Sequence, residues 1–188
     1  MKKEYFILIA TMLIIGLSGI AIGVFQKQGN KPAEPSTAQT MPEQPQINHE
    51  AILAQIETAK KQLLSAPEDR GLLISLGNMY YDLDSSQTAI TYYEKALKIN
   101  PDDAMVLVDC GAMYRASGNS DKAIEYFKKA IKINPRLAQA YFNLGIVLHM
   151  EKGDRDGAIE AWKKYLELEP NSPIKGFLND LISGSAGS

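Results

Sequence analysis

The chain has 188 residues, of which 45% are hydrophobic and 22% charged, proportions that are ordinary for a folded protein. Its formal net charge of −2 argues against a nucleic-acid-binding protein, because such proteins normally present a basic surface to the phosphate backbone. The single cysteine, Cys110, excludes an internal disulfide and a cysteine-rich metal site.

Segment 5–25 predicts a transmembrane helix. Its 21 residues carry no charge, and as a helix they would extend about 31 Å, close to the ~30 Å thickness of the hydrocarbon core. The alternative is a cleaved signal peptide, with Gly19 and Ala21 as the small residues of the cleavage site. We favour an uncleaved anchor because the apolar run continues through Phe25.

The segments on either side of this helix predict how the chain is placed. Residues 1–4 form a very short tail, which favours the arrangement with the tail in the cytoplasm. Residues 26–48 are rich in Gln, Pro, Thr and Glu, which predicts a flexible linker. We therefore expect a single-pass protein of the inner (cytoplasmic) membrane, with its folded part on the periplasmic or extracytoplasmic side.

The rest of the chain repeats itself. "KALKINP" occupies 95–101, and "KAIKINP" occupies 129–135, which is 34 residues later. A proline recurs at intervals of 34, 34 and 35 residues, at Pro67, Pro101, Pro135 and Pro170. A fixed period in this range predicts a stacked array of repeat units rather than a single globular pattern.

Each repeat unit predicts two short helices, because it contains two segments with apolar residues at helical spacing. Turns are predicted between them at 83–86, 117–120 and 152–156. Three residue types recur in register: a glycine on the first helix, an alanine on the second, and a large ring on the second. They are Gly77, Gly111 and Gly145; Ala89, Ala123 and Ala158; and Tyr93, Phe127 and Trp162. We expect the two backbones to approach closely at the glycine, with the ring beside them.

These residues resemble the tetratricopeptide repeat (TPR) family. The first unit matches the family pattern at Leu73, Leu76, Gly77, Tyr80, Ala89, Tyr93, Ala96 and Pro101. The second unit has Cys110 where leucine is usual, and the third has Tyr165 where a small residue is usual. The third unit also has one extra residue between Leu148 and Ala158. The resemblance implies an all-α fold: a right-handed superhelical stack of antiparallel helix pairs behind the N-terminal transmembrane helix.

The period divides the folded part into a leading helix, three repeats and a closing helix. The leading helix is the second half of a degenerate repeat, with Asn48 as its N-cap. The closing helix is expected to take its N-cap from Asn171 or Ser172 and to hold a proline in its first turn. The expected ranges are 49–66 for the leading helix, 67–100, 101–134 and 135–169 for the repeats, 170–183 for the capping helix and 184–188 for a disordered tail.

No catalytic motif stands out, so we expect the chain not to be an enzyme and to need no cofactor or metal. Cys110 falls at a core position of its repeat, where a buried structural thiol is expected rather than a nucleophile. The acidic pairs 102–103 and 154–156 are better explained by helix capping and turn formation than by metal ligation.

The resemblance implies a binding surface, because in this family the first helices of the pairs line a concave groove. The candidates that face it by their phase in the repeat are Ile74, Asn78, Tyr81, Val108, Arg115, Phe142, Ile146 and His149. Their mixture of apolar and polar side chains suits a peptide from a partner protein. The alternative is that these residues pack against neighbouring repeats. One variant of the fold captures a C-terminal carboxylate with lysine and asparagine. Ile74 stands where that lysine would be needed, which disfavours this mode.

Anchor, linker and repeats together are similar in layout to the membrane-anchored proteins that help assemble c-type cytochromes. This layout implies a scaffold or adaptor for protein–protein interactions in an envelope assembly process. The alternative is a structural or self-assembling component of a pilus, secretion or outer-membrane complex, which would form homo-oligomers. The expected partners are a protein or peptide in the groove and the membrane, and not nucleic acid.

Overall fold

The computed structural model describes residues 49–184, which belong to the second of two compact units, Gln46–Ser188. The predicted transmembrane segment 5–25, the linker 26–48 with its proposed N-cap, and residues 185–188 lie outside the described residues. Among the helices of residues 49–184, none is long and apolar enough to cross a membrane.

The described residues form eight helices and no strand. Helix α2 (His49–Ser65) comes first, and α9 (Lys175–Ser183) comes last. Between them lie three pairs: α3 (Arg70–Asp82) with α4 (Ser86–Ile99), α5 (Ala104–Ala116) with α6 (Ser120–Ile133), and α7 (Ala138–Met150) with α8 (Arg155–Leu168). The all-α repeat fold that the period predicts is therefore confirmed for residues 49–184.

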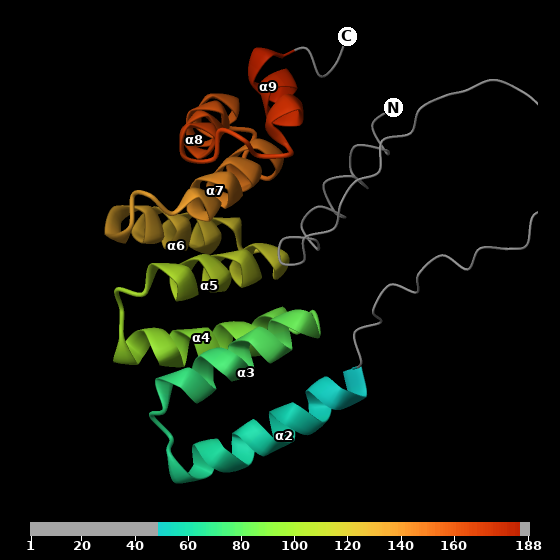
Figure 1. Ribbon diagram of the computed structural model, residues 1–188, viewed down its shortest axis with the longest axis vertical. Coiled ribbons are helices and arrows are strands. Elements are labelled where there is room, and N and C mark those ends of the chain that lie inside the picture. Colours follow the sequence, from blue (N-terminus) through green and yellow to red (C-terminus); the bar gives the residue numbers. More distant parts are fainter. Residues whose placement is uncertain (1–48, 185–188) are drawn as a thin grey trace, which may run out of the picture. The chain divides into compact units, whose positions relative to one another are not determined.

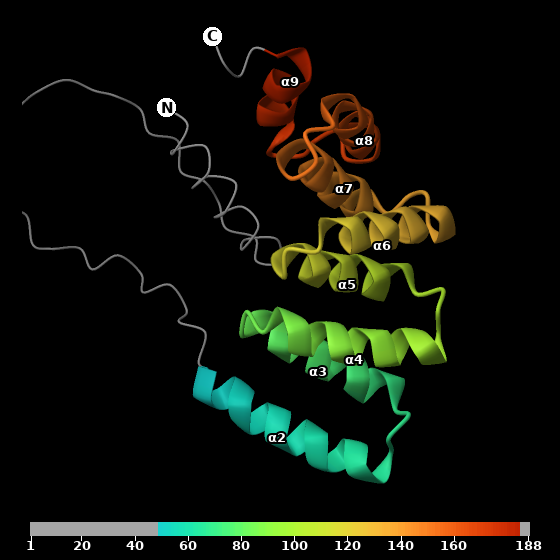
Figure 2. The same cartoon turned by 180° about the vertical axis from the view of Figure 1, so that it is seen from behind.

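Within this unit the helices follow one another in chain order along the stack (Figures 1 and 2). The closest packing lies within the pairs, and α4 packs on α5 and α6 on α7 to join one pair to the next. The first helices α5 and α7 also touch each other. Each repeat therefore contacts only its neighbours, as expected of a solenoid.

The interior of each pair depends on the recurring glycine. A Cβ atom added at this glycine would lie only 2.3–2.7 Å from the nearest atom of the ring on the second helix. The glycine–ring pairs are Gly77 with Tyr93, Gly111 with Phe127, and Gly145 with Trp162. The rings are 1%, 0% and 3% exposed, so they have no room to move away. Glycine is required here because the ring lies directly on the backbone of the first helix.

Aspartates begin the helices where capping was predicted. The carboxylate of Asp103 accepts hydrogen bonds from the backbone N–H groups of Met105 and Val106, at 3.0 and 3.1 Å. Asp154 accepts a similar bond from the N–H of Gly157 at 2.9 Å. Each satisfies donors that the first turn of a helix leaves unpaired. The capping interpretation of the acidic pairs is confirmed.

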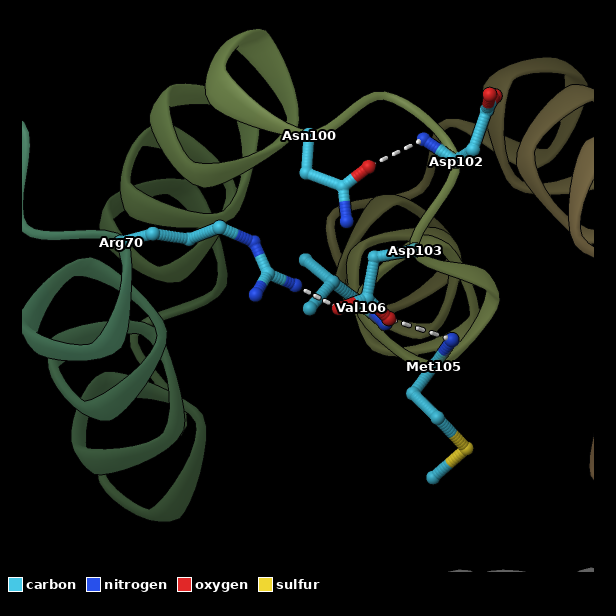
Figure 3. A network of polar contacts seen from close by, with 6 residues as sticks. All are labelled: Arg70, Asn100, Asp102, Asp103, Met105 and Val106. Carbon is cyan, nitrogen blue, oxygen red and sulfur yellow. Dashed lines mark hydrogen bonds and ion pairs between the residues drawn. The ribbon is translucent and has the colours of Figure 1, made fainter.

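Asp103 also joins two repeats. Its second carboxylate oxygen forms an ion pair with Arg70, the first residue of α3, as Figure 3 shows. On the other side, the backbone N–H of Asp102 donates to the side chain of Asn100 at 3.2 Å, which shapes the turn before the cap. One aspartate therefore caps α5 and holds the start of α3 against it.

The closing helix begins later than predicted. Helix α9 starts at Lys175, and neither Asn171 nor Ser172 is its N-cap, so that prediction was wrong. The proline of this segment lies before the helix and not in its first turn. The hydroxyl of Ser172 lies 2.8 Å from the hydroxyl of Tyr165, to which it is hydrogen-bonded. Leu178 is fully buried, so α9 still covers apolar surface at this end of the stack.

We predict that Gly111→Ala lowers the free energy of unfolding by about 1–3 kcal/mol, because the added methyl group overlaps a ring that cannot yield. Urea denaturation followed by circular dichroism measures the change. Gly176→Ala in α9 is the matched control, since nothing lies within 4 Å of its added methyl group. That control should be neutral or stabilising by up to ~1 kcal/mol. Equal destabilisation by both changes would contradict the role given to the glycine.

Candidate protein-interaction site

All eight candidate residues lie on the first helices of the pairs, α3, α5 and α7. Six of them keep exposed surface: Ile74, Asn78, Tyr81, Arg115, Phe142 and His149. The other two do not, because the side chains of Val108 and Ile146 are only 1% and 4% exposed. These two lie on α5 and α7, the first helices that touch each other. Val108 and Ile146 therefore pack against neighbouring repeats, which is the alternative to groove binding, and they offer no surface to a partner.

On α3, the candidate side chains are held by the repeat itself. The hydroxyl of Tyr93 donates a hydrogen bond to the side-chain oxygen of Asn78 at 2.8 Å, so the second helix sets the direction of this amide. Ile74 and Tyr81 are partly buried and pack against the core. Their remaining surface is fixed in position, which lowers the entropy lost when a partner binds.

On α5, Arg115 is tied to the following repeat. Its guanidinium group forms an ion pair with Glu151, the C-cap residue that follows α7, at 3.6 Å. The same carboxylate accepts a hydrogen bond from the hydroxyl of Ser120 at the start of α6. Arg115 therefore links two repeats and presents a positioned rather than a freely moving cation.

On α7, the two candidates that keep exposed surface pack at a tilt against rings of the second helix. Phe142 lies against Tyr165, with ring centroids 5.2 Å apart, and His149 lies against Trp162 at 5.4 Å. The indole N–H of Trp162 donates to the backbone oxygen of Phe142 at 3.3 Å. Tyr165 departs from the family pattern, and its ring packs against the partly exposed ring of Phe142.

Asp109 is the residue on this surface that sequence reasoning missed. It lies on α5, one turn after Met105, whose side chain is 54% exposed. Burial raises the pKa of the Asp109 carboxyl from 3.8 to about 6. Its charge also raises the pKa of the Tyr81 and Tyr93 hydroxyls, after the larger effect of their own burial. The carboxyl therefore lies on the side of α5 that is turned toward the first repeat.

Within residues 49–184, no hydrogen bond or ion pair satisfies the Asp109 carboxylate. A partly desolvated charge that none of these residues pairs is unfavourable, and proteins usually pair such charges. A sequence signal for this residue exists: the same register position holds Ser75 in the first repeat and Asn143 in the third. Because the other two repeats have a neutral residue at this position, the repeat fold itself does not need a charge there.

We call the surface formed by Ile74, Asn78, Tyr81, Met105, Asp109, Arg115, Phe142 and His149 the first-helix face.

Cys110 lies next to this face but not on it. Its side chain is fully buried, and burial is the main reason that the pKa of its thiol rises to about 12. The thiol stays protonated at neutral pH, which confirms the predicted core position. In the part of the chain that the structure describes, no group of three or more His, Cys, Asp and Glu side chains is arranged to hold a metal ion.

Sequence models of the tetratricopeptide repeat match three stretches of the chain, 72–103, 111–151 and 138–172. The chain belongs to the tetratricopeptide repeat family. The family predicted from the glycine, ring and proline pattern is therefore confirmed. TPR domains are protein-interaction modules, which supports a protein–protein interaction scaffold. Comparison with curated protein sequences gives no significant match.

Solved TPR structures have the same fold. One crystal structure of MamA protein has 26% identity and a TM-score of 0.66, with 72% of each chain covered. Another crystal structure of MamA has 30% identity and a TM-score of 0.59, covering 65% of this chain and 79% of that one. The first TPR of Spaghetti (RPAP3), bound to HSP90 peptide SRMEEVD, has 22% identity and a TM-score of 0.57, covering 63% and 94%. At 22% identity, the similarity to the TPR of Spaghetti shows a shared fold and nothing more.

The raised pKa of Asp109 predicts a pH-dependent stability. The folded state binds the carboxyl proton of Asp109 more tightly than the unfolded state does. The free energy of unfolding should therefore fall as pH rises from about 4 to 7. Asparagine has no carboxyl group to ionise, so Asp109→Asn should abolish this fall in the free energy of unfolding. It should stabilise the TPR protein by about 1–3 kcal/mol at pH 7.5 and not at pH 4. Urea denaturation at the two pH values measures the difference.

Glu160→Gln is the control, because Glu160 is exposed on α8 and its replacement should change stability little at either pH. A gain from Asp109→Asn that is equal at pH 4 and pH 7.5 would contradict the desolvated carboxylate. Asparagine is a suitable replacement because Asn143, in the same register, is accommodated at 8% exposure.

Proposed function

We propose that this TPR protein is a membrane-anchored adaptor that holds a segment of a partner protein on the first-helix face during assembly of an envelope complex. The process that we propose first is c-type cytochrome maturation, on the basis of layout. The repeat family supports the adaptor role. The membrane placement rests on the apolar segment 5–25 and its flanks in the sequence.

The observation that carries the proposal is that residues on the first-helix face differ from repeat to repeat while the core residues recur. Glycine and a buried ring are found in every pair. In contrast, one partly exposed register position holds Tyr81, Arg115 and His149 in turn. Residues that repeat hold the stack together, so residues that change are available for recognition of one particular partner.

Arg115 on this face is already paired with Glu151, so the Asp109 carboxylate is the charge that favours a partner segment with a cation. A lysine or arginine placed beside Asp109 would pair with a carboxylate that is already partly desolvated, so the cost of removing water from it has been met on folding. Met105, which is exposed, and Phe142, which is partly exposed, offer apolar surface on the same face. We therefore propose a basic and apolar segment, in contrast to an acidic peptide, which Asp109 would repel.

Site-directed photocrosslinking in the native membrane tests this proposal. A photoreactive phenylalanine at Met105 of the full-length chain should capture a partner, and the same group at Lys129, exposed on α6, should not. Asp109→Asn should lower the yield at Met105 at least fivefold, because the ion pair with the partner is lost. The same bands from both positions would contradict binding on the first-helix face.

Mass spectrometry of the captured partner tests the finer part of the proposal. Recovery of an apocytochrome or of the machinery that attaches haem would support a role in c-type cytochrome maturation. Recovery of pilus, secretion or outer-membrane components instead would overturn that assignment and favour the structural alternative.

A further inference from the structure

Helix α2 exposes two leucines at one end of the stack. Leu53 is 51% exposed and Leu64 is 84% exposed, and they lie 11 residues apart, which is about three helical turns. They therefore lie along one line on the helix. The side of α2 that packs on α3 is a different one, where Ile56 and Ala59 are buried. Figure 1 shows α2 as the first helix of the stack, with α3 beside it.

The fold does not need apolar residues at these two positions. In the later second helices α4, α6 and α8, the equivalents of Leu53 and Leu64 are polar or charged, and all are exposed. These equivalents are Gln87, Asp121 and Asp156 for the first position, and Lys98, Lys132 and Glu167 for the second. The leucines are therefore particular to α2, and two large apolar side chains in line on an exposed face would be stabilised by packing on a second surface.

The charges between the leucines follow a two-fold pattern. Glu57 lies four residues after Leu53, and Lys60 lies four residues before Leu64, so both pairs are centred between residues 58 and 59. Glu57 and Lys60 lie on the same side of the helix as the leucines and form an ion pair at 3.1 Å. Lys61, which is exposed, follows. Reversing the helix direction exchanges leucine with leucine and acid with base.

We propose that α2 is a self-association surface, through which two copies of the chain pair with their α2 helices antiparallel about a two-fold axis near residues 58 and 59. Leu53 of one copy then packs on Leu64 of the other. Glu57 lies level with Lys60 and Lys61 of the second copy, and the symmetry makes each contact twice. A parallel pair would instead bring Glu57 beside Glu57, which is repulsive.

The small interface of this dimer predicts a modest affinity. The paired helices are 17 residues long, and a single helix pair offers an interface at the low end of the range for specific complexes. The dimer should therefore form and dissociate with concentration. Because α2 is at the end of the stack and the first-helix face lies on α3, α5 and α7, dimerisation leaves that face free.

Cysteine crosslinking of the full-length chain tests the antiparallel pairing. A mixture of Leu53→Cys and Leu64→Cys variants should form a disulfide-linked dimer on mild oxidation. Each variant alone should form at least tenfold less, because the antiparallel pair holds identical positions about 16 Å apart. A mixture of Gln87→Cys and Lys98→Cys, the equivalent exposed positions on α4, is the matched control. Cys110 stays in place because its thiol is buried.

Sedimentation of the full-length chain in a mild detergent tests the charge pattern. Glu57→Lys should raise the Kd of the dimer at least tenfold, and mixing it with a Lys60→Glu/Lys61→Glu variant should restore pairing. Glu125→Lys on α6 breaks an ion pair of the same spacing, Lys122–Glu125 at 2.9 Å, and should leave the Kd unchanged.

Three outcomes would overturn the proposal. The first is a monomer at every concentration up to several hundred micromolar. The second is a disulfide dimer of Leu53→Cys alone, which would show a parallel pair. The third is a monomer whose Leu64→Cys thiol reacts slowly with maleimide, which would show that the chain's own preceding segment covers the leucines.

Discussion

The stack depends on the contact between an aromatic ring and a glycine backbone, made once in each helix pair. A ring that is at most 3% exposed lies where a Cβ at the recurring glycine would collide with it, so the ring rests directly on the backbone of the first helix. The pair spacing sets where the next pair begins, and with it the direction of the side chains on α3, α5 and α7. The arrangement of the first-helix face therefore depends on three buried rings that are not part of it.

Polar contacts then join the pairs at both ends of the first helices. Arg70 and Asp103 connect the starts of α3 and α5, and Arg115 and Glu151 connect the ends of α5 and α7. Between the first and second pairs, Glu94 accepts hydrogen bonds from the hydroxyls of Tyr114 and Tyr126. Apolar packing holds the repeats together, whereas these directional contacts limit how far one repeat can rotate against the next.

Most of the fold could be predicted from the sequence because its strongest constraint is periodic. The glycine at 111 and the ring at 127 are visible as one-dimensional spacing, and so are the capping aspartates. The start of α9 could not be predicted in this way, since the hydroxyl of Ser172 bonds with Tyr165. The burial of Val108 was also hidden, because it depends on how closely α7 approaches α5. Asp109 was missed for a similar reason: desolvation belongs to the assembled stack and not to the residue.

The ends of this stack and its middle are not equivalent. The repeat formed by α5 and α6 has a neighbour on each side, whereas α2 and α9 are each covered on one side only by the described helices. In a chain of nearest-neighbour contacts, opening proceeds inward from the ends, and the central unit exchanges its amide hydrogens last. Asp109 and Arg115 both lie on α5. The centre of the first-helix face is thus held by the most persistent part of the fold, and we expect it to stay formed while the terminal helices fray.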